Sequence, residues 1–161
     1  MIEFSAESGR AANASHPGLL YDEAAKSFWA PTSSHEEFES VLVNDLDVHL
    51  DAEGRVLSID GYAPPESWNS TTAVPPSAEE GVVVVRPSGR IRGASRRLET
   101  RKPWPCYFNE LAGWLCVGEP IADVGSIAVR VAPDSVLVLT GSELRAIWLH
   151  VRRLDSISAS I

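Results

Sequence analysis

The sequence predicts a β-rich protein, either all-β or α+β, built mainly from antiparallel hairpins. Three observations support this fold class. Short apolar segments alternate with polar residues at a period of two; clusters of Gly, Pro, Asn and Asp separate these segments; and helix-start signals are scarce. We expect a sandwich or a partly open barrel with a C-terminal meander and one or two short helices. A chain of 161 residues fits a single domain.

The N-terminal region offers few strand signals. Residues 1–17 are small, polar and without a period, so we expect a flexible tail or an edge extension ahead of a single β-rich domain at 18–161. The run Ser33-Ser34-His35-Glu36-Glu37 matches a capping box, which predicts a short helix extending to about Ser40.

A first hairpin is predicted from segments 40–50 and 55–62. Asp51–Gly54 places Asp at the first and Gly at the last position of a type I turn. Pairing Leu50 with Arg55 then sets Val48 opposite Leu57 and Leu46 opposite Ile59. The apolar face of this hairpin would comprise Leu46, Val48, Leu50, Leu57 and Ile59.

The C-terminal third predicts a meander over residues 126–151. Segments 135–140 and 143–151 flank Gly141-Ser142, a two-residue hairpin loop. This loop sets Leu139 opposite Leu144 and Leu137 opposite Ala146. Residues 127–132 lead into the same unit across a Pro-Asp turn.

The middle of the chain is less regular. Residues 64–81 contain four prolines and predict a surface loop. A third hairpin is expected to join 82–86 to 90–94 across Pro87-Ser88-Gly89. Residues 107–115 fit either a helix or an extended segment.

Charge is divided unevenly along the chain. Residues 1–80 carry 15 Asp/Glu and 3 Lys/Arg, whereas residues 81–161 carry 7 and 11. The basic cluster in 86–102 consists of Arg86, Arg90, Arg92, Arg96, Arg97, Arg101 and Lys102. These side chains could contact the chain's own acidic half, a protein partner or nucleic acid. An isoelectric point near 4.9 argues against binding to nucleic acid. Arg90, Arg92, Arg96 and Arg97 are therefore candidates for binding a protein partner.

An acidic strand face is the second candidate site. Asp45, Asp47, His49 and Asp51 alternate, and Asp60 would join them across the hairpin, opposite Asp45. Carboxylates beside an imidazole can hold a divalent cation. Neighbouring residues on one face of a strand lie nearly 7 Å apart, however, so a solvated face is the simpler interpretation, and contact with a partner is a third. We assign no metal ligands.

Two cysteines and two tryptophans complete the candidates. Cys106 lies near Arg101 and Lys102 in the sequence and could be a nucleophile. Cys116 lies in an apolar run, which is typical of a side chain packed in the core. Both are expected as reduced thiols, with a disulfide as the alternative. Trp68 and Trp104 lie in Pro-rich segments, where they either fold back over the core or anchor a partner.

The leading functional hypothesis is a non-enzymatic interaction protein that binds another macromolecule, most plausibly a protein. Catalytic and cofactor-binding motifs are not recognisable, so we assign no catalytic or cofactor residues. The alternative is a small enzyme with a site between Asp45, Asp47, His49 and the 101–110 loop; nucleic-acid binding through 86–102 comes third. We expect a cytoplasmic protein without a membrane segment, because neither a signal sequence nor a long apolar run is present. A homodimer is left open.

Overall fold

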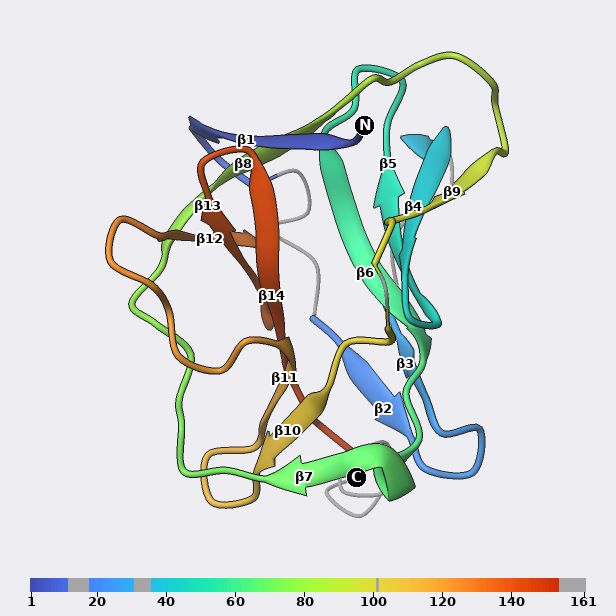
Figure 1. The fold of residues 1–161 in the computed structure, drawn as a ribbon. Coiled ribbons are helices and arrows are strands. Elements are labelled where there is room, and N and C mark those ends of the chain that lie inside the picture. The colour runs from blue at the N-terminus through green and yellow to red at the C-terminus, as the bar shows by residue number, and fades with distance from the viewer. Residues whose placement is uncertain (12–17, 31–35, 101, 154–161) are drawn as a thin grey trace.

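The computed structural model describes residues 1–11, 18–30, 36–100 and 102–153. Within them the protein consists of two β-sheets packed face to face, without a closed barrel (Figure 1). The predicted β-rich class is therefore confirmed. The helical element whose bounds lie wholly within the described residues is the 3-10 turn η2 (Pro65–Ser67). No helix of the described part is long and apolar enough to cross a membrane.

The larger sheet has eight strands and is mostly antiparallel. In spatial order they are β1 (Glu3–Ser8), β8 (Glu79–Arg86), β12 (Ile127–Ala132), β13 (Ser135–Thr140), β14 (Glu143–His150), β11 (Trp114–Gly118), β10 (Cys106–Asn109) and β7 (Trp68–Ser70). The pairs β8–β12 and β7–β10 are parallel. For residues 1–17 the sequence predicted a tail or an edge extension. Strand β1, within this segment, is an edge strand of the larger sheet. Residues 12–17 lie outside the described residues.

The smaller sheet has six strands. Their spatial order is β2 (Leu20–Asp22), β3 (Ser27–Trp29), β6 (Val56–Tyr62), β5 (Leu46–Leu50), β4 (Glu39–Val43) and β9 (Ser95–Arg97), with β4 and β9 parallel. The inner faces of the two sheets meet in the main core, where Val48 and Ile59 from the smaller sheet join Leu137 and Ile147 from the larger. Their burial supplies the main driving force for packing the sheets together.

The β5–β6 hairpin forms around the predicted turn, but the predicted register is wrong. Val48 pairs with Ile59, not with Leu57. The backbone N–H of Asp51 donates to the carbonyl of Arg55, so the loop consists of three residues, 52–54, and not of two. Gly54, at φ +86°, is the additional loop residue. A bulge that skips Leu57 shifts the pairing by one more residue. After these two single shifts Ile59 stays on its predicted face with Leu46, Val48 and Leu50, but Val56 takes the core position predicted for Leu57.

The C-terminal meander is confirmed as β12, β13 and β14. Leu139 pairs with Leu144 as predicted. A bulge next to this pair then sets Leu137 opposite Ile147, so the predicted pairing of Leu137 with Ala146 is wrong. A bulge changes the register without changing the apolar pattern on which the prediction depends.

Two other local predictions are wrong. Strand β8 pairs with β1 and β12, and the chain after it crosses to the smaller sheet and forms β9 beside β4, so residues 90–94 form no hairpin with 82–86. Strand β4 begins at Glu39, so the predicted helix does not reach Ser40, and its start at 33–35 lies outside the described residues. Residues 107–115 form no helix: 107–109 and 114–115 are strand residues of the β10–β11 hairpin, and 110–113 form its turn.

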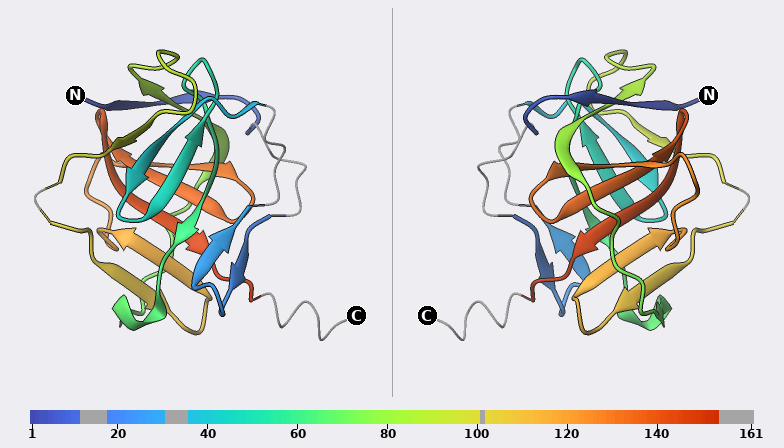
Figure 2. Two further views of the ribbon diagram at one scale, coloured as in Figure 1. Left: turned by 90° about the vertical axis from the view of Figure 1, so that its right-hand side faces the viewer. Right: turned by 90° about the vertical axis from the view of Figure 1, so that its left-hand side faces the viewer.

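The Pro-rich segment covers the larger sheet. It begins with η2 and β7, and residues 71–78 cross the outer face of that sheet to reach β8 (Figure 2). Ala73 and Ala78 pack there on a second group of buried residues, which we call the outer cluster. The outer cluster consists of Cys116, Val136, Val138, Ala146 and Trp148.

Candidate functional site

The basic segment lies against the acidic half of the chain. This placement results from the parallel pairing of β9, in the basic segment, with β4, in the acidic half. Arg92 stacks over the ring of Phe38 at 4.8 Å, and Arg97 donates to the backbone oxygen of Asn44 at 2.7 Å. Arg86 similarly donates to the backbone oxygen of Glu53.

Arg96 makes the most buried of these contacts. Its Nη2 lies 2.9 Å from Oε1 of Glu39, whose side chain is only 3% exposed. Of the four arginines expected to bind a partner, Arg92, Arg96 and Arg97 thus contact their own chain, while Arg90 is exposed. Lys102 is also exposed, and Arg101 lies outside the described residues.

Nucleic-acid affinity at physiological salt is expected to be negligible, because most of the basic cluster is engaged and the chain carries a net charge of −8. Titration of labelled single-stranded DNA and RNA at low salt and at about 150 mM salt tests this. Micromolar binding at the higher salt that is lost in an Arg90→Ala/Lys102→Ala variant would contradict it.

Trp68 and Trp104 both fold back over the main core. The Trp68 ring centroid lies 5.5 Å from that of Tyr21 and 5.0 Å from that of Phe108. The backbone N–H and carbonyl of Trp104 are both bonded to the side chain of Asn44. Both tryptophan side chains are partly buried against the main core, so packing on the core is the role that the structure supports for the two rings.

The acidic strand face is only partly assembled. Asp45 is exposed in the turn between β4 and β5. Asp51 is buried in its own turn, where its carboxylate accepts hydrogen bonds from the backbone N–H of Glu53 and from Arg55. Neither of these two carboxylates joins the cluster that their alternate spacing predicted.

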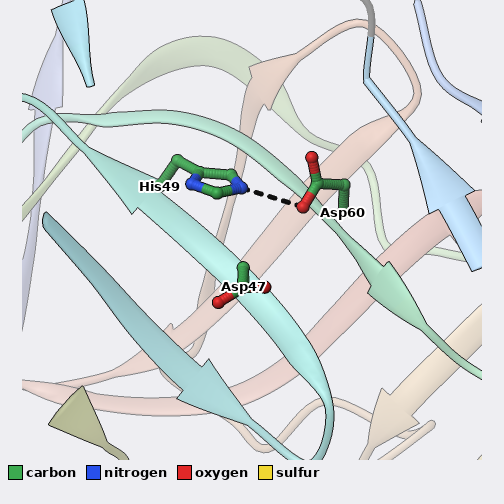
Figure 3. Close-up of side chains that lie close together, drawn as sticks. All are labelled: Asp47, His49 and Asp60. Atoms are coloured by element: carbon green, nitrogen blue, oxygen red, sulfur yellow. Dashed lines mark hydrogen bonds and ion pairs between the residues drawn. The ribbon is translucent and has the colours of Figure 1, made fainter. Parts of the chain in front are cut away.

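Asp47, His49 and Asp60 do come together, on the outer face of the smaller sheet (Figure 3). The potential ligand atoms of these three side chains all lie within 4.8 Å of one another. Nε2 of His49 lies 2.8 Å from Oδ1 of Asp60, and its Nδ1 lies 3.9 Å from Oε1 of Glu37. The register shift sets Asp60 opposite Asp47, whereas the sequence predicted Asp45.

The carboxylates around His49 control its protonation. Burial disfavours the charged imidazolium, but the hydrogen bond to Asp60 and the charges of Asp60, Glu37 and Asp47 outweigh that effect. The pKa of His49 is consequently raised above its ordinary value. The side chain therefore retains its proton to a higher pH than an isolated imidazole does.

The cysteines lie apart from this cluster. Both are free thiols. Cys106 belongs to the main core and Cys116 to the outer cluster, so their side chains lie on opposite faces of the larger sheet and do not form the alternative disulfide. Burial raises the pKa of both thiols, that of Cys116 to about 12. The thiolate needed for nucleophilic attack is therefore disfavoured.

A pocket of about 270 Å³ lies beside the 101–110 loop. Its lining consists of Val43, Asn44, Asp45, Arg97, Leu98, Thr100, Lys102 and Pro103. Of the predicted enzyme site it contains Asp45 from the acidic strand face and Lys102 and Pro103 from the 101–110 loop, but neither Asp47 nor His49. Cys106 faces the main core, whereas Asp47 and His49 lie on the outer face of the smaller sheet, so the structure does not bring the thiol together with these two side chains.

Two exposed aromatic residues were missed at the sequence level. Trp29 is 55% exposed and Tyr62 is 46% exposed, both on the outer face of the smaller sheet. Tyr62 pairs with Ser27, so Trp29, two residues further along β3, is its diagonal neighbour. The alternation of buried Phe28 with Trp29 was the available signal.

No family model, curated protein or solved structure matches this chain.

Proposed function

We propose that this protein binds another protein through the outer face of its smaller sheet, with Trp29 and Tyr62 as the anchoring side chains. The exposure of these two neighbouring rings is the observation that carries the proposal. Trp and Tyr are enriched among the residues that dominate binding energy at protein interfaces. Each supplies a large contact area while only two side-chain torsions become ordered.

The surroundings of the two rings favour a basic partner. Asp22 and Ser27 pair across β2 and β3, and Ser27 pairs with Tyr62, so Asp22 lies in the same cross-strand row as Tyr62. The backbone N–H of Tyr62 donates to the carbonyl of Asp45, so this exposed acidic residue is a neighbour of Tyr62.

The nearby basic side chains are already paired with carboxylates. Lys26 pairs with Glu66, and Arg153 lies 3.0 Å from Glu23. The face therefore presents a surplus of negative charge, which complements a partner rich in Lys or Arg and repels phosphate backbones. In a two-fold dimer through this face the same carboxylates would oppose one another, which favours a different protein over a second copy.

Site-specific photo-cross-linking tests the proposal. A photoreactive phenylalanine analogue placed at Trp29 or Tyr62 is expected to trap one dominant protein in cells that produce this chain. A matched analogue at Leu111, fully exposed in the turn between β10 and β11, serves as the control and is expected to trap none. The trapped protein is then purified and its affinity measured by calorimetry.

Affinity for the purified partner is expected to fall about 30-fold in Trp29→Ala, which corresponds to the roughly 2 kcal/mol typical of an anchoring residue. Leu111→Ala is expected to bind as the unaltered protein does. Equal trapping at Leu111, or a Trp29→Ala variant with full affinity, would contradict the proposal.

A further inference from the structure

We propose that Asp47, His49 and Asp60 form a binding site for a divalent first-row transition-metal ion, such as Mn²⁺ or Zn²⁺. This site goes beyond the proposed protein interface and rests on other residues of the same sheet face. One imidazole nitrogen and two carboxylate oxygens, held on adjacent strands β5 and β6, form the donor set (Figure 3).

The distances suit an ion with modest side-chain movement. Neighbouring ligands of an ion bound at about 2.1 Å are separated by about 3 Å. The 2.8 Å between Nε2 of His49 and Oδ1 of Asp60 already matches such a ligand pair. The third ligand, the Asp47 carboxylate, lies within 4.8 Å of the other two and would give up a 3.5 Å contact to the Ser40 hydroxyl. A small rotation of this side chain completes the set.

A buried hydroxyl next to the cluster supplies an independent observation. Ser58 is 2% exposed, and its Oγ has no hydrogen-bond partner within the described residues. It pairs with His49 across the two strands and lies two residues before Asp60, so its side chain emerges on the same face, directly opposite His49. A buried polar group without a partner is costly, and a water bound to the ion would satisfy this one.

The charges around the cluster favour a cation. Glu37 approaches the second ring nitrogen of His49, Nδ1, from the far side of the imidazole. A carboxylate in that position is the usual partner of a metal-bound histidine, where it orients the ring. The nitrogen ligand selects transition metals over Ca²⁺ and Mg²⁺, which prefer sites made of oxygen atoms alone.

Metal titration of the full chain tests the site. Mn²⁺ is added and its binding is followed by electron paramagnetic resonance, with Mg²⁺ and Ca²⁺ as competitors. We expect one bound Mn²⁺ that Zn²⁺ displaces and that a large excess of Ca²⁺ does not. Pulsed measurements on the unaltered protein are expected to show coupling to one imidazole nitrogen, and lack of that coupling would overturn the proposal without requiring any variant to fold.

Matched variants assign the ligands. Asp60→Asn and His49→Gln keep the side-chain shape and are expected to weaken Mn²⁺ binding at least tenfold. Asp45→Asn and His150→Gln alter a carboxylate and an imidazole outside the cluster and are expected to retain full affinity. Saturable binding is expected for the unaltered protein below millimolar Mn²⁺. Its absence, or equal weakening in the control variants, would overturn the site.

Discussion

Replacing Arg96 with alanine is expected to lower the free energy of unfolding by about 3–5 kcal/mol, because it leaves the Glu39 carboxylate buried without its partner. The Glu39 side chain is 3% exposed and lies on the core side of β4, opposite Leu50. Because water cannot reach a carboxylate in this position, the loss of the guanidinium is not offset by hydration. Urea denaturation at neutral pH measures the change.

The control for this prediction is Arg90→Ala, which removes an exposed guanidinium from the same segment and is expected to change stability by less than about 0.5 kcal/mol. A Glu39→Leu/Arg96→Leu double variant is expected to be more stable than Arg96→Ala, because it removes both charges and fills the space with apolar atoms. Equal losses in Arg96→Ala and Arg90→Ala would show that the pair contributes little.

Replacing Trp148 with alanine is expected to cost about 3–5 kcal/mol, because it leaves a cavity in the outer cluster. Trp148 is 1% exposed and lies between Val136 and Cys116 on the neighbouring strands. The Pro-rich segment 71–78 packs on this cluster through Ala73 and Ala78. We therefore also expect faster proteolytic cleavage within 71–78 in this variant.

Trp29→Ala is the matched control, since it deletes the same side chain from an exposed position and is expected to change stability by less than about 0.5 kcal/mol. Thermal and urea unfolding of the two variants are compared with the unaltered protein. A larger loss in Trp29→Ala than in Trp148→Ala would reverse the assignment of which tryptophan is structural.

The positions of several strands and tight turns could be predicted from the sequence because the signals are local. Alternation of apolar and polar residues marks the buried face of a strand, as for Leu46, Val48 and Leu50. Gly54 and Gly141 mark loops that require a positive φ, which both adopt. The fold class, the β5–β6 hairpin and the C-terminal meander follow from such signals.

The partners of strands far apart in sequence could not be predicted in this way. Strands β1, β7 and β9 each join a sheet beside residues distant in the chain, and β7 and β9 do so in parallel. The turn residues after β8 show where the chain bends, but not that it crosses to the other sheet. The placement of Arg92 and Arg96 beside Phe38 and Glu39 depends on that crossing.

The sequence likewise predicts one part of the candidate site, and the tertiary structure decides the other part. The alternation of Asp47 and His49 on one strand face is a property of the sequence, and it correctly places both side chains on the outer side of the sheet. Their meeting with Asp60 depends on a three-residue loop and a bulge, which shift the register by two residues. A shift of two preserves the apolar face, so hydrophobic burial alone does not distinguish the two registers. The turn and bulge geometry of the folded chain decides which carboxylate faces His49.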